Sequence, residues 1–99
     1  MKALTAKLEK KIDDQLVDFD SSEKDFHVWE IFKAAALYWV DLDEDDFCLQ
    51  SASSETLVFG GTNRLIWSAA RGFQPDQSYC TEKFLLNWQA IGPLPGLSA

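Results

Sequence analysis

The first stretch of the chain repeats its hydrophobic residues at the spacing of an α-helix. Between residues 3 and 19, the apolar side chains that recur every three or four positions are Leu4, Leu8, Ile12, Leu16 and Phe19. At about 100° per residue, these side chains fall within an arc of about 120°, the width of a helical stripe that lies on a protein core. The pattern predicts a first amphipathic helix over residues 3–19.

The next stretch predicts a second helix, with more apolar surface than one face can hold. Ser22 follows a turn and precedes Asp25 by three residues, which approximates a capping box. The main apolar stripe consists of Val28, Ile31, Phe32, Ala35 and Trp39. Further apolar residues lie off this stripe, namely Trp29, Leu37, Tyr38 and Val40. Such a helix is either central and covered on two sides, or it carries a binding surface.

After residue 46 the hydrophobic period shortens towards two, which is the repeat of a β-strand. Short strands are predicted at residues 47–51, 56–59 and 65–68. The residues between the last two strands, Gly60 to Asn63, read as a hairpin loop in which glycine can take positive φ. The pattern therefore predicts a three-stranded antiparallel meander.

The last part of the chain predicts a loop, a third helix and a tail. Residues 72–78 have the glycine, proline and aspartate content of a loop. The apolar residues that then recur at helical spacing are Phe84, Leu85, Trp88 and Ile91. Gly92 and Pro93 end this helix, and residues 93–99 are expected to be extended.

The length and composition of the chain are those of one globular domain. The chain is 46% hydrophobic and 25% charged, which supplies enough apolar surface for a core. Its length of 99 residues is too short for a second domain. We therefore expect a single α+β domain over residues 1–99, in the order α-α-β-β-β-α. Its helices should pack on one face of a three-stranded antiparallel sheet.

The net charge of −7 is confined to the N-terminal half of the chain. Residues 1–46 contain 13 acidic and 6 basic side chains, whereas residues 47–99 contain 3 of each. Nucleic-acid backbones and anionic membranes require lysine and arginine, so direct binding to either is disfavoured. A basic protein is the natural complement of this charge, and we expect such a partner.

The chain has no apolar signal core and no run of about 20 apolar residues, so the cytoplasm is the expected location. Its two cysteines, Cys48 and Cys80, lack the spacing of a metal or redox motif. Free, buried thiols are therefore expected, with a disulfide bridge as the alternative.

The sequence lacks a recognisable catalytic constellation. His27 is the only histidine, and neither cysteine stands in a sequence context typical of a Cys-His pair. Gly60-Gly61 fits neither a Walker loop nor a dinucleotide fingerprint. We therefore expect a protein without enzymatic activity and without a cofactor.

The segment from Asp41 to Asp46 contains five carboxylates in six residues and invites comparison with a calcium loop. A calcium loop needs glycine at its sixth position and glutamate at its twelfth, where this chain has Asp46 and Ala52. The segment is therefore interpreted as a solvated acidic turn, and no metal site is expected.

The working surface is predicted to combine this acidic turn with the off-stripe aromatic residues of the second helix. Exposed aromatic side chains are typical hot spots of protein interfaces. The residues predicted to contact a partner are Trp29, Tyr38, Asp41, Asp43, Glu44, Asp45 and Asp46.

Several functions are compatible with this surface. The first is a small interaction module of the inhibitor, immunity-protein or chaperone kind that binds a basic protein. A homodimer would bury the surplus aromatic residues equally well. A second function is a DNA mimic, whose carboxylates imitate phosphates. A third is a binder of a small hydrophobic ligand in a pocket lined by aromatic residues.

Overall fold

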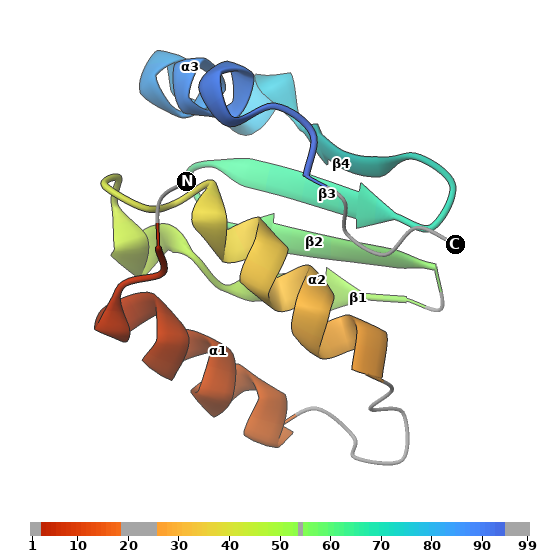
Figure 1. Cartoon of the computed structure of the whole chain (residues 1–99). Helices are drawn as coiled ribbons and strands as arrows, with labels where there is room; N and C mark the ends of the chain where they lie inside the picture. Colours follow the sequence, from red (N-terminus) through yellow and green to blue (C-terminus); the bar gives the residue numbers. More distant parts are fainter. Residues whose placement is uncertain (1–2, 19–25, 54, 95–99) are drawn as a thin grey trace.

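A computed structural model of the chain describes residues 3–18, 26–53 and 55–94 (Figure 1). The helices are α1 (Ala6–Asp18), α2 (Phe26–Leu37) and α3 (Glu82–Ile91). The strands are β1 (Leu49–Ala52), β2 (Thr56–Gly60), β3 (Arg64–Ser68) and β4 (Gly72–Pro75). Two short 3-10 helices are η2 (Glu44–Asp46) and η3 (Gln77–Tyr79). The predicted α+β class is confirmed.

The sheet has four strands, and the prediction of three strands was wrong. Residues 72–75, expected to belong to a loop, form β4 and pair antiparallel with β3. This strand escaped prediction because it combines Gly72 and Pro75, which are typical of turns, with Phe73 as its one buried residue. Proline is tolerated here because β4 is an edge strand, so the missing N–H leaves no gap in the sheet.

The predicted helices are close to those observed. α1 begins at Ala6 because Thr5 caps it: the Thr5 hydroxyl accepts a hydrogen bond from Leu8 N, and the Thr5 backbone oxygen accepts one from Glu9 N. α3 begins after Thr81, whose hydroxyl accepts from Phe84 N, and ends at Gly92, as predicted. Phe19 and the predicted capping box at Ser22 lie outside the described residues.

The strands form a meander in the order β1-β2-β3-β4, in which each strand pairs with its neighbour in sequence. β1 starts at Leu49 and not at Phe47, because Phe47 closes η2 with a backbone bond to Glu44. In the centre of the sheet Val58 lies opposite Ile66.

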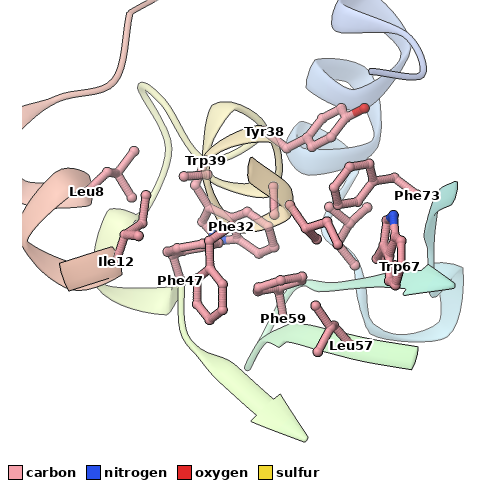
Figure 2. Close-up of a cluster of buried hydrophobic side chains, with 14 of the residues drawn as sticks. Leu8, Ile12, Phe32, Tyr38, Trp39, Phe47, Leu57, Phe59, Trp67 and Phe73 are labelled. Carbon is pink, nitrogen blue, oxygen red and sulfur yellow. The ribbon is translucent and has the colours of Figure 1, made fainter. Parts of the chain in front are cut away.

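All three helices contribute to one core on one side of the sheet, as Figure 2 illustrates for α1 and α2. Alternate strand residues point into this core, namely Leu57, Phe59, Leu65, Trp67 and Phe73. The aromatic rings pack edge to face or stacked, with centroids 5.1 Å apart for Phe32 and Phe59 and 5.7 Å apart for Phe47 and Phe59. The aromatic residues thus supply much of the core of this short chain.

Candidate functional site

The acidic turn, residues 41–46, follows α2 after the short segment 38–40 and contains η2. Asp41 has a φ of 66°, a left-handed conformation that aspartate tolerates better than most residues. Asp43 caps η2, since its carboxylate accepts a hydrogen bond from Asp45 N at 3.2 Å. The side chains of Asp41, Asp43 and Asp45 are exposed, as predicted for a solvated turn.

Polar contacts fasten the turn to α1. The hydroxyl of Thr5 donates to the carboxylate of Glu44 at 2.7 Å, and Lys7 Nζ lies 2.8 Å from the carboxylate of Asp45. The hydrogen bond between Lys7 and Asp45 raises the pKa of Lys7 and lowers the pKa of Asp45. Lys11 Nζ donates to the backbone oxygen of Asp45 at 2.9 Å. The acidic segments of α1 and of the turn therefore adjoin in space.

Asp46 fastens the other side of the turn to the β2–β3 hairpin. Its two carboxylate oxygens accept hydrogen bonds from the backbone N–H groups of Thr62 at 2.7 Å and Asn63 at 2.8 Å. Both Asp46 and Glu44 are partly buried. Glu44 and Asp46 thus combine partial burial with contacts inside the fold, whereas the exposed Asp43 and Asp45 have contacts at the surface.

Tyr38 does not contribute to an exposed surface, and this part of the prediction was wrong. The residue is fully buried, at 0% exposed, and its ring packs against Phe73 with centroids 5.7 Å apart. Its hydroxyl donates to Gly92 O at 2.7 Å and accepts from Leu94 N at 3.0 Å. Burial raises the pKa of Tyr38. α2 is covered on two sides, by α1 on one side and by the end of α3 on the other. Tyr38 is therefore buried although it lies off the main apolar stripe.

Trp29 is exposed as predicted, but it lies away from the acidic turn. The side chain is 37% exposed, and Lys33 Nζ lies 5.5 Å from the ring centroid. Trp29 is near the start of α2 and the turn follows its end (Figure 1). Trp29 is eight residues from Leu37, the last residue of α2, which is about 12 Å along the helix at 1.5 Å per residue, and the turn begins beyond that end. The structure therefore does not join Trp29 to the acidic turn.

The outer surface of α1 extends the negative charge of the turn. Glu9, Asp13 and Asp14 are all exposed, and Asp14 forms an ion pair with Lys10 at 2.9 Å. Within the described part of the chain, Glu9 and Asp13 make no ion pair. The sequence analysis assigned charge to this region but did not include these two residues in the predicted partner-binding set, although their spacing of four places them on one side of a helix.

A hollow of about 240 Å³ lies beside the acidic turn and was missed by the sequence analysis. Its walls come from the turn, the β2–β3 hairpin and the start of α3, and they include Asp43, Asp46, Asn63, Thr81 and Lys83. These segments are distant in sequence, so no local pattern indicated the hollow.

The cysteines are free thiols, as expected, but both are only partly buried and not fully buried. Cys80 Sγ donates to Arg64 O at 3.3 Å, and burial raises the pKa of this thiol, which makes it a weaker nucleophile at neutral pH. Among residues 3–18, 26–53 and 55–94, no group of three or more His, Cys, Asp or Glu side chains is arranged to hold a metal ion. The side chain of His27 lies outside the described residues.

No protein-family model, curated protein or solved structure matched the chain. Across the described segments, no helix combines the length and the apolar character needed to cross a membrane. The surface chemistry of the domain is therefore the basis for the function proposed below.

Proposed function

We propose that this domain is a non-enzymatic module that binds a basic protein through the exposed carboxylates of α1 and the acidic turn. The observation that carries the proposal is the attachment of the turn to α1 by the Thr5–Glu44 and Lys7–Asp45 contacts. These contacts place two acidic segments, separate in sequence, on adjoining surfaces. A partner with a basic patch would meet both segments at once.

The lysines of this region are already paired, so they leave part of its negative charge without a cation. Lys7 and Lys10 each pair with a carboxylate, and Lys11 donates to backbone oxygens. Glu9 and Asp13 have no such cation beside them in the described part of the chain. The lysines therefore reduce the charge of their own partners and leave these two carboxylates to attract an external cation.

The arrangement favours a protein partner over mimicry of DNA. A mimic needs carboxylates at quasi-regular spacing, but on α1 the row that contains Glu9 and Asp13 continues with Val17. The neighbouring row pairs Lys10 with Asp14. Alternating signs and an apolar residue are typical of a protein interface and unlike a phosphate backbone.

A hydrophobic ligand has less support, because the large aromatic residues fill the core. Trp39, Phe47 and Phe59 are fully buried and pack against one another or against other rings. The hollow beside the acidic turn has no aromatic residue in its lining.

Affinity capture with charge-neutralised variants tests the proposal. The protein would be immobilised and exposed to extract of its native host, and the captured basic protein would then be purified and its binding measured. Glu9→Gln/Asp13→Asn and Asp43→Asn/Asp45→Asn should each weaken this binding by roughly threefold to tenfold, since exposed charge pairs contribute below about 1 kcal/mol each. The association rate should fall as salt is added.

The matched control is Glu55→Gln/Glu82→Gln, which removes the same charge from exposed positions outside α1 and the turn. This variant should bind as the unmodified protein does. Equal binding by all three variants would show that the partner contacts another surface.

A further inference from the structure

The hollow beside the acidic turn has walls of opposite charge. The carboxylates of Asp43 and Asp46 come from the turn, whereas Lys83 comes from the first turn of α3. Within the described residues, Lys83 forms no ion pair with either carboxylate. A cation and two carboxylates thus border one cavity without neutralising each other by direct contact.

The wall formed by α3 also offers hydrogen-bond donors. At the start of a helix, the first backbone N–H groups have no partner within the helix. Thr81 accepts from the N–H groups of Phe84 and Leu85, at its hydroxyl and its backbone oxygen respectively. The N–H groups of Glu82 and Lys83 have no acceptor among the described residues. Together with Lys83 Nζ, they favour a negative group.

Asn63 adds a positioned hydrogen-bond donor to the hollow. It is the buried polar residue of the described core, at 6% exposed, and it lines the hollow. Its Oδ1 accepts from Thr81 N at 2.8 Å, but its Nδ2 has no acceptor in the part of the chain that the structure describes. Nδ2 is not one of the sealed, unsatisfied polar atoms of the described residues, so solvent reaches it although the residue as a whole is buried. A ligand in the hollow would accept from Nδ2 in place of solvent.

We propose that this hollow binds a small zwitterion of the α-amino acid class. The ligand carboxylate would accept from Asn63 Nδ2, Lys83 Nζ and the first N–H groups of α3. The ligand ammonium group would donate to Asp43 and Asp46, whose oxygens retain free lone pairs after accepting the bonds described above. The volume of about 240 Å³ is below the range of about 300–1,000 Å³ that accommodates drug-sized ligands, so a small metabolite suits it.

Simpler ions fit the hollow less well. An anion alone would leave the carboxylates of Asp43 and Asp46 facing it, and a cation alone would face Lys83 and the donor groups of α3. Only a ligand that carries both charges satisfies both walls. This inference shares Asp43 with the proposed partner surface, but Asn63 and Lys83 line the hollow and are not part of that surface, so Lys83→Met separates the two proposals.

Nuclear magnetic resonance of the isotope-labelled full chain tests the inference. Each of the common free amino acids would be added up to about 10 mM, which detects even weak binding. At least one should produce saturable shifts of the Asn63 side-chain amide and of the Glu82 and Lys83 backbone amides. Its N-acetyl and carboxamide derivatives should each bind at least about tenfold more weakly, since each lacks one charge-assisted contact.

Variants on the two walls should behave alike. Lys83→Met and Asp43→Asn should each weaken binding by about tenfold, because each removes one charged contact. Both should fold, since Lys83 is exposed and asparagine retains the capping ability of Asp43. The matched controls are Lys10→Met and Asp14→Asn on α1, which make the same charge changes away from the hollow and should leave binding unchanged.

The absence of any saturable shift at these amides would overturn the inference. Acetate or the blocked derivatives binding as tightly as the free amino acid would overturn it as well, because the site would then recognise one charge only. Unchanged binding by Lys83→Met and Asp43→Asn would place the ligand elsewhere on the protein.

Discussion

At the scale of single residues, Gly60 shows how sharply the backbone restricts the sequence. Its φ of 106° is a conformation that side chains rarely allow. A Cβ at this position would lie 1.9 Å from Asn63 O and 2.9 Å from a ring atom of Trp39. Both neighbours are fixed, one by the hairpin and the other by the core. The tight end of the β2–β3 hairpin therefore requires glycine.

Gly60→Ala is expected to lower the free energy of unfolding by about 3 kcal/mol or more, because the Cβ must displace backbone and core atoms in addition to straining φ. Gly72→Ala is the matched control: its φ is 71°, but a Cβ there meets nothing within 4 Å. Its cost should be about 1 kcal/mol, from the strain alone. Urea unfolding of the two variants measures both values, and equal costs would contradict the predicted clash.

At the scale of elements, Tyr38 connects the end of α2 to the segment that follows α3. Its ring lies between α2 and β4, and its hydroxyl binds the backbone of Gly92 and Leu94. From the other side, Asn87 Nδ2 on α3 donates to Tyr38 O at 2.7 Å. These contacts make α2 the central helix and fix residues 92–94 beside it.

Tyr38→Phe should therefore lower the free energy of unfolding by about 1–3 kcal/mol at neutral pH, since Leu94 N and Gly92 O lose a partner. The pKa of Tyr38 is raised in the folded protein, so its contribution is fully present below its unfolded pKa of about 10. It is lost as the pH rises through the higher folded pKa. Urea unfolding at neutral and alkaline pH measures this loss, and Tyr38→Phe should reduce the alkaline part of it. An identical pH dependence in the variant would contradict this role.

The sequence predicted elements well where one physical pattern dominates. α1 and α3 have a single apolar stripe, and β2 and β3 alternate regularly, so their positions followed from spacing. β4 was missed because Gly72 and Pro75 are typical of a loop. As an edge strand it buries only Phe73, so it has no alternating apolar pattern that would have predicted it. The periodicity of α2 shows excess apolar surface, but it does not distinguish burial on two sides from exposure. Tyr38 was therefore misplaced, whereas Trp29 was correctly expected to be exposed.

The contacts of the candidate site were harder to predict, because they join distant segments. Asp46 binds the backbone of Thr62 and Asn63, and Glu44 binds Thr5, which is 39 residues away in sequence. A run of acidic residues indicates charge but gives no information about such partners. The acidic turn was located correctly, while the contacts of its carboxylates with α1 and with the β2–β3 hairpin became evident only in the fold.

At the scale of the whole molecule, the net charge and the scattering of the exposed apolar residues both disfavour self-association. The net charge of −7 opposes the approach of a second copy. The exposed large apolar residues of the described part come from four different elements, namely Val17, Trp29, Tyr79 and Leu86. Single exposed apolar residues are ordinary on a protein surface and do not make an interface by themselves.

We therefore expect the isolated protein to be a monomer. Light scattering coupled to size-exclusion chromatography should give the mass of one chain at both low and high salt, because neither condition supplies a contiguous apolar interface. A mass of two chains at both salt concentrations would instead indicate an apolar homodimer. In that case, the charge-based partner proposal would have to be tested on the dimer.

The meander of the sheet also has a consequence for the order in which the protein folds. Each strand pairs with the next one in sequence, so the closure of every hairpin constrains only a short loop and loses little chain entropy. The attachment of α1 is different, because Thr5 must find Glu44 across a much longer loop. Local pairings of this kind form faster than distant ones. We therefore expect the hairpins of the sheet to form early in folding and α1 to dock late, together with the acidic surface that it completes.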